Sequence, residues 1–278
     1  MKRIIVTADD FGMCKFVDDA IIELISCGTL SSTNVLVNFK EEESAKKLKE
    51  FSNISIGIHW NLTLGKPVSK PEDVQSLVDK DGNFYSSIEL KNRLLKRKLL
   101  KKDIERELKA QFDCFCERYK KLPIYWNTHE NISHNKFIFD ICCNVAKEKK
   151  IKATRNFDRV YIDFELVNNK IRRIREYIVR TILHCRYKKI EAFFKMPNGR
   201  IVCFFNNSKT DIERNKKAIL EYKYDNIEMV IHPATNIDYD LFGNIGKDRI
   251  EEYNVYRSKE MYDFLHNNKI KIITFEDL

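Results

Sequence analysis

Two adjacent carboxylates, Asp9 and Asp10, follow a short apolar run near the start of the chain and precede a phenylalanine and a glycine. The run is rich in β-branched residues and too short for a helix, which predicts a buried strand ending in a turn. Buried carboxylates are costly unless a cation or a donor pairs with them. The pair therefore predicts a divalent metal site with a group that moves a proton. The alternative, in which one aspartate caps the next helix, is equally compatible with these residues alone.

Three histidines, His59, His129 and His232, lie at or near the ends of later apolar runs. The carboxyl ends of strands in a β/α barrel meet on one face, so these imidazoles can converge with the aspartates. One Asp and two imidazoles suit Zn²⁺, and also Mn²⁺, Co²⁺, Ni²⁺ or Fe²⁺. A single histidine at a strand end is more often structural. Here histidines recur at the ends of three predicted strands, which favours a functional site. His134 is either a further imidazole of this site or a cap of the following helix.

The elements that must position these residues alternate between strand and helix. We expect strands at residues 3–8, 33–39, 54–63, 124–129, 151–155, 227–232 and 270–275, and helices at 17–27, 41–51, 88–120, 135–149, 171–185, 211–222 and 249–266. This alternation predicts a parallel sheet or a β/α barrel. We expect one domain over residues 1–278, with a basic insertion at about 157–222 where the pattern weakens. Residues 65–87 form a loop long enough to face a substrate.

The net charge of +9 is concentrated in one stretch, because residues 170–200 contain ten basic and two acidic residues. The simplest interpretation is a solvated helical face. The alternative is a surface for an anionic substrate, a lipid headgroup or a polynucleotide. No nucleic-acid-binding motif accompanies the stretch, so we do not expect nucleic acid as a partner. A peripheral membrane contact through residues 170–200 and a homodimer both stay open.

The sequence predicts a cytoplasmic protein. It has no apolar run long enough to span a bilayer and no signal peptide at its start. The 8 cysteines are scattered without a CxxC pair, which favours free and mostly buried thiols over disulfides.

Several motifs give the chain a resemblance to the YdjC/ChbG family of carbohydrate deacetylases. They keep the family's order and extend over nearly the whole sequence. The matching segments are Thr-Ala-Asp-Asp-Phe-Gly at residues 7–12, Ser-Ser-Thr-Asn-Val-Leu-Val-Asn at 31–38, Gly-Ile-His-Trp-Asn-Leu-Thr-Leu-Gly-Lys-Pro at 57–67, Asp-Gly-Asn-Phe at 81–84, Thr-His-Glu-Asn-Ile-Ser-His at 128–134 and Ile-His-Pro-Ala at 231–234.

The resemblance implies an irregular, TIM-like β/α barrel that hydrolyses the N-acetyl group of an amino sugar. It implies one divalent ion, Mg²⁺ or Zn²⁺ with Mn²⁺, Co²⁺ or Ni²⁺ as further candidates, held by Asp10, His59 and His129. Asp9 corresponds to the general base that activates water, and His232 to the acid that protonates the leaving amine. The expected partner is an N-acetylated amino sugar, such as an N-acetylglucosamine oligosaccharide or glycoconjugate.

Two further residues are candidates for substrate binding. Arg155 follows the strand at 151–155, where the family tends to place an arginine near the site. Tyr85 and Trp60 could each stack on a sugar ring, although packing is the favoured role of Trp60.

The third ligand segment departs from the family pattern Asp-Ser-His-x-His-x-His. Asn127 replaces the aspartate, the middle histidine is missing, and one residue is inserted before His134. An asparagine cannot supply the charge that a carboxylate lends to a ligating imidazole.

Two other functions fit the same residues. One is a metal-dependent hydrolase of a different amide or ester. The other is a non-catalytic binding protein that uses the basic stretch as its partner surface. Retention of both Asp9 and His232 favours an enzyme, because a binder needs neither an acid nor a base.

Overall fold

The strands of the computed structural model form one sheet, and each of its ladders is parallel. The strand order is β5-β4-β3-β2-β1-β7-β6, with β8 paired to β1. The structure describes residues 1–39, 42–161, 170–202, 212–267 and 270–278. The strands are β1 (Lys2–Phe11), β2 (Ser32–Val35), β3 (Ser55–Trp60), β4 (Tyr125–Thr128), β5 (Ala153–Thr154), β6 (Gly199–Val202), β7 (Asn226–Ile231) and β8 (Ile270–Ile272).

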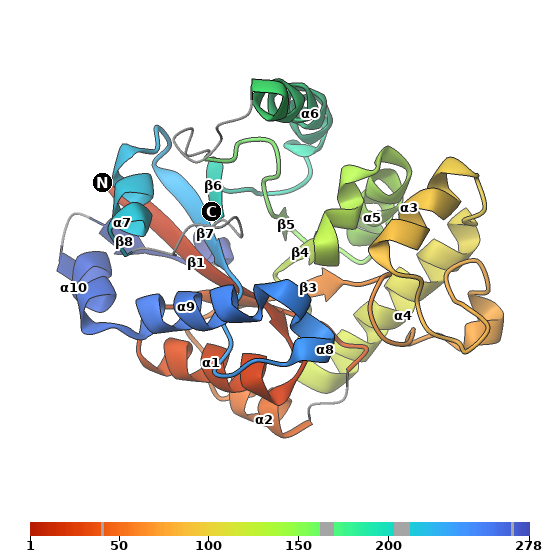
Figure 1. Ribbon diagram of the computed structural model, residues 1–278, viewed down its shortest axis with the longest axis horizontal. Helices are drawn as coiled ribbons and strands as arrows, with labels where there is room; N and C mark the ends of the chain where they lie inside the picture. Colours follow the sequence, from red (N-terminus) through yellow and green to blue (C-terminus); the bar gives the residue numbers. More distant parts are fainter. Residues whose placement is uncertain (40–41, 162–169, 203–211, 268–269) are drawn as a thin grey trace.

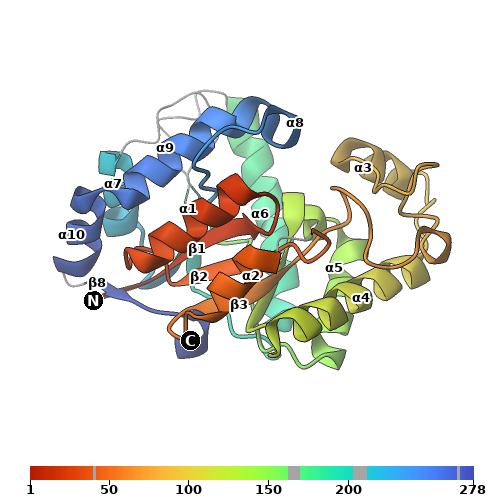
Figure 2. The same cartoon turned by 90° about the horizontal axis from the view of Figure 1, so that it is seen from below.

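Helices surround the sheet, with α7 and α10 on the side of the N-terminus and α3 and α4 on the opposite side (Figures 1 and 2). Helix α1 packs against α2 and α9. The helices are α1 (Lys15–Ser26), α2 (Glu42–Lys49), α3 (Ser87–Leu95), α4 (Lys101–Tyr119), α5 (Lys136–Glu148), α6 (Lys170–Ile190), α7 (Ile212–Glu221), α8 (Tyr239–Phe242), α9 (Gly246–Arg257) and α10 (Lys259–Asn267). Short 3-10 turns are η1 (Pro71–Asp73), η2 (His129–His134), η3 (Gly243–Ile245) and η4 (Phe275–Asp277).

The predicted α/β class is confirmed, whereas the barrel is open rather than closed. The parallel sheet forms a half-barrel whose ladder ends at β5 on one side and β6 on the other. In the described part of the chain, isolated bridges at Ala153–Lys195 and Val160–Arg200 lie across this opening. Two features keep it open: β5 has two residues, and β8 pairs with β1 instead of extending the ladder.

Two predicted helices are each divided. Residues 88–120 form α3 and α4, and between them Arg97 adopts a left-handed conformation with φ of 54°. Residues 249–266 form α9 and α10, separated at Ser258, which has ψ of 143°. The Ser258 hydroxyl accepts a hydrogen bond from Met261 N–H at 3.2 Å, so a local cap begins α10.

Strand β6 was not predicted, because it has only four residues and lies in the part of the sequence where the pattern weakens. It pairs with β7 over Gly199–Val202. The stretch at 157–222, expected as an insertion, therefore contributes a strand to the sheet.

Seven cysteines lie in the described ranges and all are free, as expected, but only Cys142 and Cys143 are buried. The eighth, Cys203, lies outside the described residues. No helix within those ranges has the length and apolar character that a membrane crossing requires.

Large aromatic side chains fill the core around β3 and β4. Trp60 and Trp126 are fully buried with their ring centroids 5.4 Å apart, which agrees with a packing role for Trp60. Tyr125 stacks on Phe275 at 3.8 Å, and its ring lies against the bare Cα of Gly57. A Cβ added at Gly57 would lie 2.6 Å from ring carbons of Tyr125.

We expect Gly57→Ala to lower the free energy of unfolding by about 1–3 kcal/mol, because the added methyl group overpacks the Tyr125 contact. Urea denaturation measures the loss. The matched control is Ser52→Ala at an exposed position, which should change stability by less than about 0.5 kcal/mol. Equal stability of the two variants would contradict the close packing of β3 on Tyr125.

Candidate active site

Asp10 lies near the end of β1, just before the turn at Gly12, and its backbone adopts a left-handed conformation with φ of 74°. A non-glycine residue in this region stores strain that its surroundings must offset. Asp18 stabilises the turn, because its Oδ1 accepts a hydrogen bond from Gly12 N–H at 2.6 Å. Helix α1 begins after Cys14 without a side-chain cap. The alternative in which Asp9 or Asp10 caps this helix is therefore wrong.

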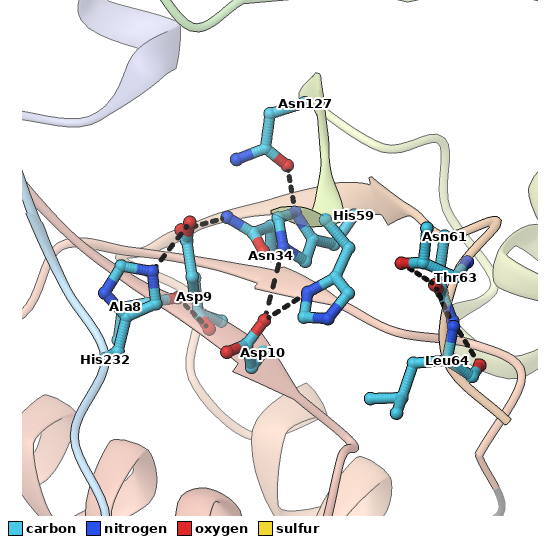
Figure 3. Close-up of polar contacts among 12 residues, drawn as sticks. Ala8, Asp9, Asp10, Asn34, His59, Asn61, Thr63, Leu64, Asn127 and His232 are labelled. Carbon is cyan, nitrogen blue, oxygen red and sulfur yellow. Dashed lines mark hydrogen bonds and ion pairs between the residues drawn. The ribbon is translucent and has the colours of Figure 1, made fainter. Parts of the chain in front are cut away.

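The structure brings together the three predicted metal ligands, Asp10, His59 and His129. Asp10 Oδ1 lies 3.3 Å from His59 Nε2 and 3.0 Å from His129 Nδ1. One donor atom from each residue lies within 4.8 Å of the others. Figure 3 shows the Asp10 carboxylate directed toward His59. A divalent ion fits this set, because three protein ligands of N and O type leave coordination positions for water and substrate.

Asn127 orients His59 rather than His129. Its Oδ1 accepts a hydrogen bond from His59 Nδ1 at 2.6 Å (Figure 3). This contact keeps the proton on Nδ1 and leaves Nε2 facing Asp10. The sequence pattern placed Asn127 beside His129, its near neighbour in the chain. The difference arises because β3 and β4 pair in register at His59 and Asn127.

The second oxygen of Asp10 is held by Arg249, a residue that the sequence did not indicate. Arg249 Nη2 donates to Asp10 Oδ2 at 2.6 Å, and both side chains are buried. Burial by itself raises the pKa of Asp10, but His129 and Arg249 hold it well below its ordinary value. Asp10 is therefore an anion whose two oxygens have different tasks: one faces the imidazoles and the other is fixed by the guanidinium.

Asp9 faces a different set of partners from its neighbour. Arg155 donates to both of its oxygens, at 2.6 and 2.7 Å, and Asn34 Nδ2 donates to Oδ1 at 2.6 Å. Arg155 also binds Glu228, at 3.0 Å from Nε and 2.9 Å from Nη2. Burial is the largest single effect and raises the pKa of Asp9, but the charge and hydrogen bonds of Arg155, together with His59 and His232, hold it well below its ordinary value. Arg155 lines the cavity and is held between two buried carboxylates. Its contact with substrate stays a prediction.

His232 lies beside Asp9, as the predicted acid–base pair requires. Its Nε2 is 3.6 Å from Asp9 Oδ2, and Figure 3 shows the ring next to this carboxylate. Burial lowers the pKa of His232 to about 4, so the imidazole is neutral at pH 7. The backbone N–H of His232 donates to Glu252 of α9. Burial raises the pKa of Glu252 to about 8.

The Asp10 cluster and the Asp9–His232 pair line a cavity of about 360 Å³, to which Leu183 of α6 also contributes. His134 also lines it, but is not part of the Asp10 cluster; Asn135, rather than His134, caps α5. Tyr85 is not among the lining residues, and its ring lies under the Arg93 guanidinium at 4.1 Å. The described residues of the lining are Asp9, Asp10, His59, Thr128, His129, Glu130, Asn131, His134, Arg155, Phe157, Val160, Leu183, Arg200, Val202, Val230, His232, Ile245 and Arg249.

Sequence reasoning missed several polar residues that support the site. Glu228 gave a signal that could have been used, since it is a single charge within an apolar strand. Such a residue is rarely buried without a partner. Asn34, a buried polar residue in β2, gave a weaker signal of the same kind. Arg249 and Glu252 gave none, because helix α9 carries charges all along its length.

The parallel half-barrel combines an Asp–His–His cluster that could hold a metal ion with a neighbouring Asp–His pair, an arrangement suited to a hydrolase. The family comparison agrees with this class. The model of the YdjC-like protein family matches residues 3–267, so the chain belongs to the YdjC-like family.

Relatives from bacteria match over the full length. Proteins named carbohydrate deacetylase from Clostridium beijerinckii and Brevibacillus brevis are each 28% identical over 280 aligned positions, covering 99% of this chain and 100% and 99% of theirs. A crystal structure from Enterococcus faecalis V583, of a protein described provisionally as a cellobiose-phosphate cleavage protein, has the same fold with a TM-score of 0.77. It is 22% identical and covers 99% of this chain and 98% of its own.

We expect Asn127→Leu to weaken Zn²⁺ binding by about 10–100-fold, because His59 loses the acceptor that fixes its tautomer and ring orientation. Calorimetric titration of the metal-free protein with Zn²⁺ measures this. Asn127→Asp restores an acceptor at the same place and should bind Zn²⁺ at least as tightly as the wild type. Unchanged affinity in Asn127→Leu would contradict the orienting role.

The raised pKa of Glu252 predicts how stability depends on pH. Between its ordinary value of 4.5 and about 8, the folded protein keeps a proton that the unfolded chain has released. Stability therefore falls as pH rises through this window. In Glu252→Gln, whose amide oxygen can still accept from His232 N–H, this loss should disappear.

Urea midpoints at pH 5, 7 and 9, with metal removed by a chelator, test this. The stability of Glu252→Gln relative to the wild type should increase at each step. Glu251→Gln, an exposed neighbour on α9, is the control and should follow the wild type. Parallel pH profiles for all three proteins would show that Glu252 titrates normally.

Proposed function

We propose that this protein is a metal-dependent hydrolase that removes an N-acetyl group from an amino sugar. The observation that carries the proposal is the meeting of the Asp10–His59–His129 cluster and the Asp9–His232 pair at one cavity. Membership of the YdjC-like family and the deacetylase names of the bacterial relatives support it. The substrate class we infer is an N-acetylglucosamine-type oligosaccharide or glycoconjugate.

An amide is a poor electrophile with a poor leaving group. Its hydrolysis therefore requires activation of the carbonyl and protonation of the leaving amine. A divalent ion held by Asp10, His59 and His129 would polarise the acetyl carbonyl and make water a stronger nucleophile near neutral pH. Arg249 fixes the remaining oxygen of Asp10 at 2.6 Å. This contact holds the carboxylate in the orientation in which its other oxygen faces both imidazoles.

Asp9 and His232 divide the proton transfers. Asp9 is ionised, because the paired Arg155 keeps its pKa low, and its Oδ2 accepts the proton of the attacking water. His232 is neutral at rest and returns a proton to the sugar nitrogen as the C–N bond breaks. The 3.6 Å separation of Asp9 Oδ2 and His232 Nε2 allows a proton to pass between them during the cycle.

The cavity is at the small end of the range for ligand pockets, at about 360 Å³. It is large enough for one sugar residue around the acetamide. The remainder of an oligosaccharide would lie outside, along the exposed rim at Glu130 and Asn131.

Acetate release from N-acetylglucosamine oligosaccharides, with added metal and after chelation, tests the proposal. Asp10→Ala should lose both Zn²⁺ binding and activity. Asp9→Asn and His232→Ala should keep Zn²⁺ affinity while kcat falls by about 10²–10⁴-fold, the usual contribution of a general acid or base. Zn²⁺ titration of the same samples also shows whether each variant has a folded site.

The control is Asp19→Asn, which removes a partly exposed carboxylate on α1 and should leave kcat unchanged. Activity that survives both chelation and Asp10→Ala would exclude the mechanism. If Asp9→Asn abolished metal binding but kept the rate per bound ion, the roles of Asp9 and Asp10 would be exchanged. Release of acetate from simple esters or other amides, without action on sugars, would replace the substrate class.

A further inference from the structure

A third arginine of the cavity, Arg200, has no carboxylate partner of its own. It lies on β6 in register with Glu228 of β7, so the two side chains project from the same face of the sheet. Both oxygens of Glu228 accept from Arg155. Among the described residues, no ion pair or side-chain hydrogen bond joins Arg200 to any acceptor, and its Nε is buried without a partner. Arg200 lines the cavity and is 7% exposed.

Burying a guanidinium in this way is costly, since it leaves donors unpaired and places a charge near another of the same sign. Burial and the Arg155 charge lower the pKa of Arg200 to about 10. It therefore remains a cation at pH 7. The Phe157 ring covers one face of the guanidinium, with its centroid 4.6 Å from Cζ. This contact fixes the plane of the side chain without satisfying its hydrogen-bond donors.

His134 adds a second unpaired polar atom at the same wall, a ring nitrogen that donates in the Nε2–H tautomer. Its ring meets Phe157 edge to face, with centroids 5.4 Å apart, so Arg200 and His134 share one aromatic support. The Nε2 atom of His134 is buried and has no hydrogen-bond partner among the described residues. Burial, Arg200 and Arg186 lower the pKa of His134 to about 4, which leaves it neutral at pH 7. Arg186 of α6 donates to the His134 carbonyl at 2.6 Å and holds this turn in place.

We propose that Arg200 and His134 form a subsite for an anionic substituent of the sugar, and that this substituent is a carboxylate. This inference rests on the proposed function, because it describes the substrate of the same cavity. A guanidinium is a planar fork that matches the two oxygens of a carboxylate. The neighbouring guanidinium, Arg155, already pairs with Asp9 and Glu228, so Arg200 alone is left to meet a substituent, and one fork fits the single charge of a carboxylate. The residues predict an enzyme that acts on acidic amino sugars in preference to neutral ones.

Calorimetry with three sugars that differ only at C6 tests the subsite: N-acetylglucosamine, N-acetylglucosaminuronic acid and N-acetylglucosamine 6-phosphate. N-acetylmuramic acid, which carries its carboxylate on O3, is a fourth probe for a different placement. We expect a carboxylate sugar to bind the wild type at least about 10-fold more tightly than N-acetylglucosamine, the effect of one charge-assisted contact. Arg200→Gln should abolish this preference, and Arg200→Lys should restore part of it.

Lys188→Gln is the matched control, because it removes the same charge from an exposed position on α6. It should keep the full preference for the acidic sugar. Equal binding of all four sugars by the wild type, or a preference that survives Arg200→Gln, would overturn the proposal. An Arg200-dependent gain that is larger for the 6-phosphate than for either carboxylate would overturn the assignment to a carboxylate.

Measurements of sugar binding and of acetate release distinguish failure of the subsite proposal from failure of the proposed deacetylase function. Arg200-dependent binding of an acidic sugar without any release of acetate would refute the deacetylase function and leave the subsite in place. Release of acetate from neutral oligosaccharides, with equal binding of neutral and acidic sugars, would refute the subsite alone.

Discussion

The burial of two adjacent carboxylates at the end of β1 is the constraint on which the rest of the site depends. Neither Asp9 nor Asp10 can be buried as an anion unless cations and hydrogen-bond donors contact its carboxylate. Arg155 arrives from the end of β5 and Arg249 from α9, and each binds one of the two aspartates. The left-handed backbone at Asp10 directs the adjacent side chains to different partners. One short strand end thus carries two separate chemical functions.

Parallel pairing converts distant sequence positions into one cavity. The ends of β1, β3, β4 and β7 carry Asp10, His59, Asn127 and the segment leading to His232, and their register brings these groups together. The open edge between β5 and β6 gives the cavity its second half. Arg200, Phe157 and Leu183 of α6 line the cavity on this side, where a closed barrel would have a further strand.

Much of the fold was readable from local patterns. The alternation of apolar runs and amphipathic segments predicted the α/β class, and the ordered motifs predicted the family, which the family comparison confirms. The donors of the Asp10 cluster were also found, because Asp and His after apolar runs are unusual residue types in a recurring position. The acid and base roles of Asp9 and His232 stay predictions. The divided helices and β6 were missed, since Arg97 and Ser258 carry weak break signals and β6 is short.

By itself, the sequence determined which residues can do chemistry and at which strand ends they lie, because periodicity and residue type are local properties. Only the tertiary structure decided which partner each of them takes. Asn127 serves His59 rather than His129 because the β3–β4 register sets these two side by side. Arg155 binds both Asp9 and Glu228, and Arg249 reaches Asp10 from a helix 239 residues away in the chain. Such pairings depend on strand register and helix docking, for which no local pattern carries a signal.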